Sequence, residues 1–212
     1  MCSGTVGIVT LAGFNEIDTF VATRMVDSVA GLSVDLVGPE PTAISMAGVE
    51  VATPGTWRSL KDADAVLIGS GSRTFSHIED AEIIDGLAGS LSASQMIGSQ
   101  CSGAAILHRL GLVDGHMVCT DRVTAPRLRS LGVTVVEEAF RSTGNIASAG
   151  GCLSSAYLAY WVIDRIASRA DADEALLRVL PIGEEDEFIE RARMYVNVRE
   201  DADASNLEAS QN

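Results

Sequence analysis

The sequence is poor in aromatic side chains, in positive charge and in histidine, and each shortage narrows what the chain can be. Only 5% of its 212 residues are aromatic although 47% are hydrophobic, so aliphatic side chains must fill the core. Such a core suits buried parallel strands that are covered by helices. A chain of this length is expected to form one well-buried domain.

Positive charge is scarce as well. The chain has 15 Lys and Arg against 29 Asp and Glu, a formal net charge of −14. This balance argues against nucleic acid or an anionic membrane as a partner. The N-terminus lacks a basic region followed by an apolar core, and no apolar run approaches membrane-spanning length. We therefore expect a cytoplasmic protein.

Paired cysteine spacings are also missing. The four cysteines show neither a zinc-knuckle spacing nor a disulfide framework, and they are Cys2, Cys101, Cys119 and Cys152. The sequence has no metal, nucleotide or flavin motif, so we expect no cofactor.

Acidic residues crowd the C-terminal end. This pattern predicts a domain over residues 4–183 and a solvated, partly disordered acidic extension over residues 184–212. The residues concerned include Glu184, Glu185, Asp186, Glu187, Glu190, Glu200, Asp201 and Asp203.

Short apolar runs alternate with segments of helical periodicity along the domain. Residues 5–11 and 32–38 are predicted strands, and apolar residues recur at helical spacing between them. This strand–helix–strand unit indicates a right-handed crossover in a parallel sheet. Further strands are expected over residues 64–72 and 145–149. The fold class is α/β: a doubly wound, mostly parallel sheet flanked by helices, of the flavodoxin-like or class I glutamine amidotransferase-like type.

Smaller elements are predicted on the flanks of the sheet. Residues 42–52 are predicted as a hairpin of two short strands. A helix is expected over residues 122–131 despite Pro126, and Gly150-Gly151 opens a long helix.

Residues 95–107 (QMIGSQCSGAAIL) contain the feature around which the chain is organised. A strand runs directly into a helix at Cys101, which predicts a nucleophile elbow with a strained, exposed corner residue. Gly103 fits the elbow pattern, and Ser99 stands where a second glycine is usual. The N-terminus of the helix favours a thiolate. The alternative is a buried structural cysteine.

In open sheets of this kind, chemistry gathers where strands end at their carboxyl side. The loop after the first strand offers Glu16 and Asp18 as a partner for Cys101, although such residues often only cap a helix. The backbone N–H groups of Gly71 and Ser102 would together form an oxyanion hole.

Histidine, the usual base for a cysteine nucleophile, is nearly absent. The three histidines are His77, His108 and His116, and each is more readily explained by packing or surface position. A Cys-His-Asp hydrolase is therefore disfavoured.

Four segments taken in order resemble the ThiJ/PfpI superfamily, which has the class I glutamine amidotransferase-like fold. They are residues 13–19 (GFNEIDT), 66–71 (VLIGSG), 99–104 (SQCSGA) and 144–150 (GNIASAG). The resemblance spans about residues 4–180 and is strongest to the isocyanide hydratase branch.

The resemblance implies a set of roles for these residues. Cys101 matches the nucleophile and Asp18 its partner acid, while Ser102 replaces the usual Thr and Gly71 matches the oxyanion glycine. In that branch a thiolate attacks the terminal isocyanide carbon, and water then releases an N-formamide. The resemblance also implies a small electrophilic substrate and a homodimer.

Two departures from the family pattern affect the functional prediction. The Gly-Pro after the acid is missing, and Asp121 stands where many members have His. The missing His weighs against protease, deglycase or glyoxalase chemistry. A second carboxylate would raise the pKa of the Cys101 thiol unless Arg122 or another cation compensates.

Two functions therefore remain open from the sequence. The first is a cysteine-dependent hydratase or lyase. The second is a non-catalytic redox-sensing or regulatory protein with an oxidisable cysteine.

Overall fold

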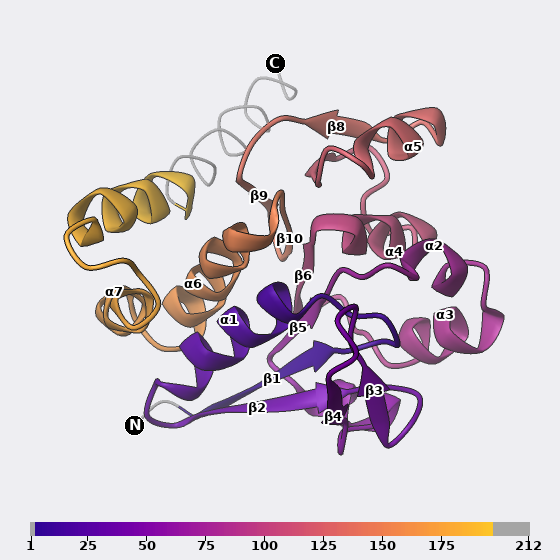
Figure 1. Cartoon of the computed structure of the whole chain (residues 1–212), viewed down its shortest axis with the longest axis horizontal. Coiled ribbons are helices and arrows are strands. Elements are labelled where there is room, and N and C mark those ends of the chain that lie inside the picture. Colours follow the sequence, from indigo (N-terminus) through magenta and orange to yellow (C-terminus); the bar gives the residue numbers. More distant parts are fainter. Residues whose placement is uncertain (1–2, 197–212) are drawn as a thin grey trace.

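The centre of the fold is a six-stranded sheet in the order β2-β1-β5-β6-β10-β9 (Figure 1). The computed structural model describes residues 3–196. Neighbouring strands are parallel except for β9, which pairs antiparallel with β10. The predicted mostly parallel sheet is thus confirmed. The strands are β1 (Gly4–Val9), β2 (Leu32–Val37), β5 (Ala65–Ile68), β6 (Met96–Gln100), β9 (Phe140–Thr143) and β10 (Ile146–Ala149).

Helices cover both faces of this sheet, as Figure 1 shows. Side chains alternate along β5, so that Ala65 and Leu67 face one hydrophobic core while Val66 and Ile68 face the other. The first core packs α1 (Glu16–Asp27), α6 (Ser155–Ile166) and α7 (Arg169–Leu177). The second packs α3 (Ala81–Ala88), α4 (Ala104–Arg109) and the 3₁₀ helix η1 (Trp57–Asp62), and the short α2 (Thr74–His77) lies beside α4.

Two smaller ribbons lie outside the main sheet. As predicted, residues 42–52 form an antiparallel pair, β3 (Thr42–Ile44) and β4 (Glu50–Ala52). The second ribbon pairs β7 (Met117–Cys119) with β8 (Thr134–Val136) in parallel. The helix expected over residues 122–131 is shorter, α5 (Ala125–Ser130), because Asp121 caps the preceding turn and Pro126 sits in the first helical turn. Strand β9 was not predicted.

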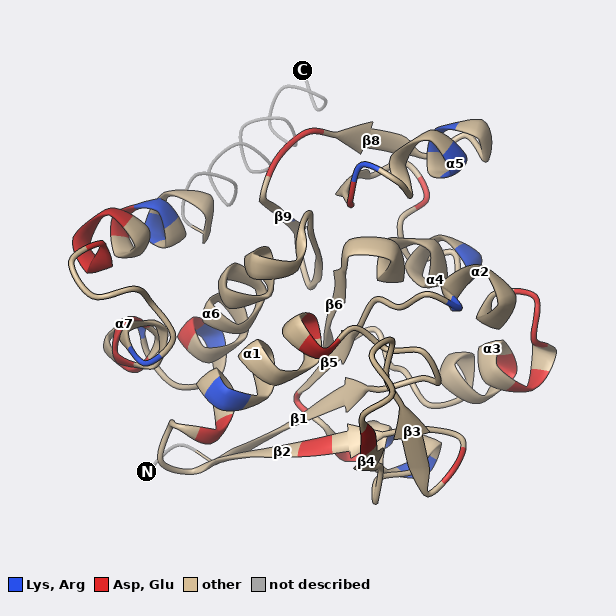
Figure 2. Cartoon of the chain, viewed as in Figure 1, with Lys and Arg blue, Asp and Glu red and all other residues tan. Residues whose placement is uncertain are grey.

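A further helical segment follows α7 and packs against the domain. Residues 185–196 are helical, and Ala192 and Val196 are buried in the same core as α6. Figure 2 shows acidic residues, coloured red, at the start of this helix. Residues 184–196 of the predicted acidic extension therefore pack on the domain, and residues 197–212 lie outside the described part.

Within residues 3–196, no helix combines the length and apolar character that crossing a bilayer requires.

Candidate active site

Cys101 lies at the corner between β6 and the helix that follows it. Strand β6 ends at Gln100, the 3₁₀ turn η2 spans Cys101–Gly103, and α4 begins at Ala104. Cys101 has φ of 45°, the one positive φ among the non-glycine residues of the described chain. A backbone in this region is strained for any L side chain, and such strain is common at functional sites. The strained corner that the elbow pattern predicts is thus present.

The elbow also requires a close approach of two backbones. A Cβ atom on Gly103 would lie 2.6 Å from the carbonyl oxygen of Ile68 and 3.0 Å from that of Gly69. Only glycine therefore lets η2 pack against the end of β5. Ser99, which stands where a second glycine is usual, is fully buried within β6.

The expectation of an exposed corner residue is wrong. Cys101 is only 3% exposed, because polar side chains of neighbouring segments close over it. The amide Nε2 of Gln100 donates toward its sulfur at 3.6 Å and also donates to the carbonyl oxygen of Gly151 at 2.7 Å. Burial raises the pKa of the Cys101 thiol above its usual range, and the nearby Asp18, Cys152 and Asp121 raise it further.

Asp18 projects from the first turn of α1 into this buried region. Asn15 caps that helix by accepting the N–H of Ile17, which fixes the turn that carries Asp18. The carboxyl group is 2% exposed, and its Oδ2 accepts hydrogen bonds from the hydroxyl and the backbone N–H of Ser70. Burial raises the pKa of Asp18 to about 6, although the Ser70 hydrogen bonds act in the opposite direction.

Cys152 completes the cluster and was not identified from the sequence. A carboxylate oxygen of Asp18 and the sulfurs of Cys101 and Cys152 all lie within 4.8 Å of one another. Nδ2 of Asn15 donates to the Cys152 sulfur at 3.2 Å, whereas burial and the nearby Asp18 charge raise the pKa of the Cys152 thiol. Cys152 is partly exposed, whereas the other two are buried.

This cluster is the one group in residues 3–196 whose thiol or acidic side chains are close enough to share a metal ion. Two sulfurs and a carboxylate are donors that suit zinc, but they are one ligand short of a closed tetrahedral site. The amide groups of Asn15 and Gln100 already direct N–H donors at the two sulfurs. A closed zinc site would therefore need a fourth ligand in addition to these three side chains.

The predicted oxyanion donors lie beside the elbow. The backbone N–H of Gly71 donates to the Ser102 hydroxyl at 3.2 Å, and the Thr74 hydroxyl contacts the same oxygen at 2.8 Å. A Cβ atom on Gly71 would lie 2.4 Å from the carbonyl oxygen of Gly13, so this turn needs a glycine. The structure thus brings the glycine turn after β5 and the elbow into direct contact.

Glu16 and Asp121, the other two carboxylates expected near Cys101, form their hydrogen bonds elsewhere. Oε1 of Glu16 accepts the N–H of Ala47 at 2.8 Å, in the turn between β3 and β4. Oδ1 of Asp121 accepts the N–H groups of Val123 and Thr124 at 2.8 and 2.9 Å, and so caps the turn before α5. Asp121 does not take the place of a catalytic histidine by contact, and it acts on Cys101 only through its charge.

His77 also has a structural position. It is buried, and its Nε2 lies 2.8 Å from the carbonyl oxygen of Ala12, which ties α2 to the loop after β1.

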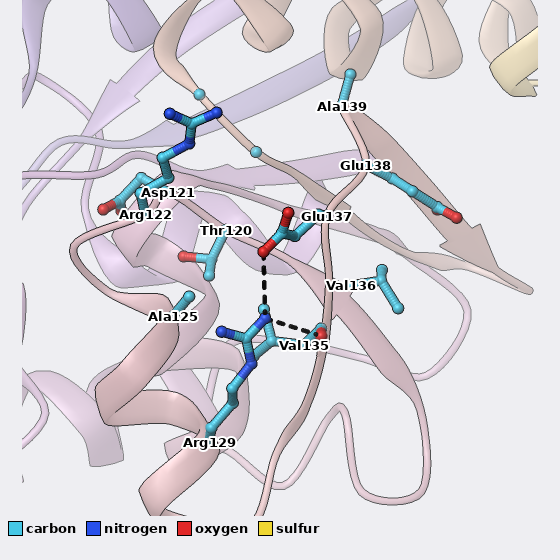
Figure 3. A pocket seen from close by; sticks show the side chains of 12 residues that line it. Thr120, Asp121, Arg122, Ala125, Arg129, Val135, Val136, Glu137, Glu138 and Ala139 are labelled. Atoms are coloured by element: carbon cyan, nitrogen blue, oxygen red, sulfur yellow. Dashed lines mark hydrogen bonds and ion pairs between the residues drawn. The ribbon is translucent and has the colours of Figure 1, made fainter.

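A cleft of about 890 Å³ runs beside the cluster (Figure 3). Its wall includes Gly150 and Gly151, which directly precede Cys152, and Thr120, whose hydroxyl donates to the carbonyl oxygen of Cys101 at 2.7 Å. Arg129 crosses the cleft toward Glu137 and the carbonyl oxygen of Val135, as Figure 3 shows. The cleft therefore reaches the residues that precede Cys152 and the side chain that hydrogen-bonds the backbone of Cys101, but neither cysteine lines it.

A smaller cavity lies behind Asp18, on the core side. Its volume is about 10 Å³, and its wall includes Asp18, Thr19 and Gln100. Each of these residues has one buried oxygen without a hydrogen-bond partner: Oδ1 of Asp18, Oγ1 of Thr19 and Oε1 of Gln100.

The chain has a mostly parallel sheet covered by helices and a cysteine at a nucleophile elbow, which together are typical of α/β proteins with a cysteine at the active site. The sequence profile described as "DJ-1/PfpI family" matches residues 5–164. The chain therefore belongs to the DJ-1/PfpI family, and the resemblance to the ThiJ/PfpI superfamily is confirmed.

Solved structures of the same fold show low sequence identity to the chain. A ThiJ/PfpI family protein from Pseudomonas syringae has a TM-score of 0.77 at 18% identity, over 92% of this chain and 88% of that one. Drosophila melanogaster DJ-1beta has a TM-score of 0.73 at 17% identity, over 84% and 97%. An AraC family transcriptional regulator from Pseudomonas putida has a TM-score of 0.70 at 15% identity, over 84% and 100%. No functionally curated protein matches the chain.

Proposed function

We propose that the protein is a cysteine-dependent hydratase or lyase that adds water to a small electrophilic carbon, with an isocyanide as the substrate class. The observation that carries this proposal is the placement of the buried Asp18 carboxyl group within 4.8 Å of the Cys101 sulfur. Histidine is not part of this cluster. The chemistry must therefore rely on a carboxyl group that can both take and return a proton near neutral pH.

The raised pKa of Asp18 suits that task. A group with a pKa of about 6 is mostly ionised at pH 7.5, yet it is protonated at little cost. Because the Cys101 sulfur and a carboxylate oxygen of Asp18 lie within 4.8 Å of each other, the proton of the attacking thiol has a short route to the carboxylate. Cys101 then acts as a nucleophile that is deprotonated as it attacks, rather than as a resting thiolate.

The proposed reaction balances with water as the only co-reactant. The Cys101 sulfur bonds to the terminal carbon of the isocyanide, Asp18 takes the thiol proton, and that proton is delivered to the same carbon to give a thioimidate. Water adds to the thioimidate carbon, the carbon–sulfur bond breaks, and the N-formamide leaves while the thiol is restored. The Ser102 N–H is the proposed donor to the charge that develops in the tetrahedral intermediate, and the Gly71 N–H joins it by leaving the Ser102 hydroxyl, to which it donates at 3.2 Å.

Formation of the formamide from an aryl isocyanide tests this proposal. We expect turnover by the wild-type chain, and loss of turnover in Cys101→Ala and Asp18→Asn. Cys119→Ala is the matched control, because it removes a buried thiol outside the cluster and should retain activity. Absence of formamide from the wild-type protein, in the presence of a fully reduced Cys101, would contradict the proposal.

The second candidate is a redox-sensing or regulatory protein without turnover. The presence of two adjacent thiols, one of them partly exposed, is the observation that favours it. A reactive thiol without formamide production would support this candidate. A homodimer, which the family resemblance implies, is part of both proposals.

A further inference from the structure

The pair formed by Cys101 and Cys152 suggests chemistry beyond a hydratase. The two thiols come from segments far apart in the sequence, the elbow after β6 and the 3₁₀ turn η3 (Cys152–Ser154) after β10. Parallel pairing of β6 with β10 sets Gln100 beside Ala149, so the chain leaves both strands at the same level of the sheet. Gln100 then ties the two segments together through its hydrogen bond to the Gly151 carbonyl oxygen.

Cys101 and Cys152 differ in their exposure to solvent. Cys101 is buried, whereas Cys152 is partly exposed and follows two residues that line the large cleft. Nδ2 of Asn15 donates to the Cys152 sulfur at 3.2 Å and favours its thiolate form, whereas burial and the Asp18 charge raise the pKa of this thiol. Because Cys152 is the more exposed of the two sulfurs, an oxidant from solvent meets Cys152 first.

We propose that Cys152 is a peroxide-reactive thiol and that Cys101 resolves it, so that the two close an intramolecular disulfide. In the first step the Cys152 sulfur attacks a peroxide oxygen, the oxygen–oxygen bond breaks, and Cys152 becomes a sulfenic acid as one molecule of water leaves. In the second step Cys101 attacks that sulfur, and the hydroxyl group leaves as a second water. Hydrogen peroxide is reduced, and the two thiols are oxidised by two electrons in total.

The backbone around Cys152 leaves room for the disulfide to close. A bond requires the sulfurs to approach from within 4.8 Å to about 2 Å. Gly151 has φ of 88°, and a Cβ atom placed on it would meet no atom within 4 Å, so η3 has open space on that side. The buried Cys101 can remain in place while Cys152 moves toward it.

The disulfide would remove the proposed nucleophile reversibly, but the inference does not depend on turnover. It needs only the two thiols and a peroxide, and its readout is the covalent state of each cysteine. Failure of the hydratase proposal would therefore leave this test unaffected, and a failed disulfide would leave the formamide assay unaffected.

The test treats the reduced full-length chain with a small excess of hydrogen peroxide and maps the products by peptide mass spectrometry. We expect a loss of two hydrogens from the intact protein, a Cys101–Cys152 cross-linked peptide, and full reversal by a dithiol reductant. In Cys101→Ser, Cys152 should stop at a sulfenic acid that a dimedone-type reagent traps. In Cys152→Ser no cross-link should form, and oxidation of Cys101 should be slower by about tenfold or more because of its burial.

Cys119→Ala is the matched control and should form the same cross-link at the same rate. The proposal is overturned if wild-type Cys101 advances to a sulfinic acid while Cys152 stays reduced. It is also overturned if the cross-link joins either cysteine to Cys2 or Cys119, or joins two copies of the chain. If Cys101 is oxidised equally fast in wild type and in Cys152→Ser, Cys152 is not the entry point and the proposed order of steps is wrong.

Discussion

The Ser102 hydroxyl accepts the backbone N–H of Gly71 at 3.2 Å, and this contact joins the elbow to the glycine turn after β5. The Thr74 hydroxyl reaches the same oxygen at 2.8 Å, which adds the start of α2 to the contact. The Ser102 hydroxyl therefore links three segments at the carboxyl end of the sheet: the elbow, the glycine turn and the start of α2.

Replacement of Ser102 by Ala is expected to destabilise the fold by about 1 kcal/mol, because the partly buried Gly71 N–H loses its acceptor. Thr74→Val should cost about 1 kcal/mol, and the double variant should cost less than the sum, since both remove the same contact. Urea unfolding of the four proteins measures this coupling. The exposed Ser94→Ala serves as the control, and strictly additive effects would contradict the shared contact.

The activity of the proposed hydratase should depend on pH through Asp18. The carboxylate form accepts the thiol proton, so kcat/KM should fall as pH decreases through about 6, the raised pKa of this group. The plateau should lie above about pH 7. A profile of kcat/KM against pH, measured where the fold stays intact, provides the check, and a profile that is flat between pH 5 and 7.5 would exclude Asp18 as the base.

The same raised pKa predicts a change in stability. Folded Asp18 holds its proton up to about pH 6, whereas in the unfolded chain it ionises near pH 4, so folding stability falls as pH rises between these values. Asp18→Asn removes this penalty. We expect it to be more stable than wild type at pH 7.5, by at most about 3 kcal/mol, and to be nearly equal to wild type at pH 4.

Urea unfolding at both pH values measures this difference. Asp27→Asn is the control, because Asp27 lies exposed on the same helix and its replacement should change stability little at either pH. A destabilised Asp18→Asn at pH 7.5 would show that the Ser70 hydrogen bonds outweigh the burial of the charge.

The positive φ of Cys101 predicts that a glycine at this position gives a more stable protein than an alanine does. Glycine adopts this conformation without strain, whereas alanine does not, so Cys101→Gly should be more stable than Cys101→Ala by about 1 kcal/mol. In the helix that follows, Ala104→Gly should instead be destabilising by about 1 kcal/mol. Thermal unfolding of the three variants gives the comparison, and a Cys101→Ala protein that matches Cys101→Gly would show that the corner is unstrained.

The small cavity behind Asp18 is expected to hold one ordered water molecule. Its volume of about 10 Å³ is close to the minimum for one water, and three unpaired oxygens surround it. Such a water would accept from the Thr19 hydroxyl and donate to Oδ1 of Asp18 and Oε1 of Gln100. A crystal structure at high resolution should show its density within hydrogen-bonding distance of all three oxygens, and a dry cavity would contradict this expectation.

Local sequence patterns were sufficient to predict the sheet and the elbow. A buried aliphatic strand that is followed directly by small residues allows few backbone conformations at the corner. Gly103 is needed there because a Cβ atom would meet the carbonyl oxygens of Ile68 and Gly69. The pairing of the glycine turn with the elbow follows from the neighbouring positions of β5 and β6.

The site's second thiol could not be found in this way. Cys152 reaches Cys101 only because β10 pairs with β6 in one register and because a 3₁₀ turn, rather than the predicted helix, follows Gly151. Neither feature has a local sequence signal. The sequence position of Asp121 predicts a place beside Cys101, but its carboxylate caps a turn by accepting three hydrogen bonds from Val123 and Thr124.

The helix of residues 185–196 has a consequence for how the protein can associate. It shares a hydrophobic core with α6 through Ala192 and Val196, its Tyr195 ring lies 5.3 Å from that of Tyr157, and Arg193 pairs with Asp173 of α7. The chain thus shields this flank of the domain with its own C-terminal segment, beyond residue 164 where the family match ends. Another molecule that approaches this flank therefore meets residues 185–196 and not the part of α6 that they cover, and a chain shortened to residue 184 would expose that apolar surface of α6 to solvent.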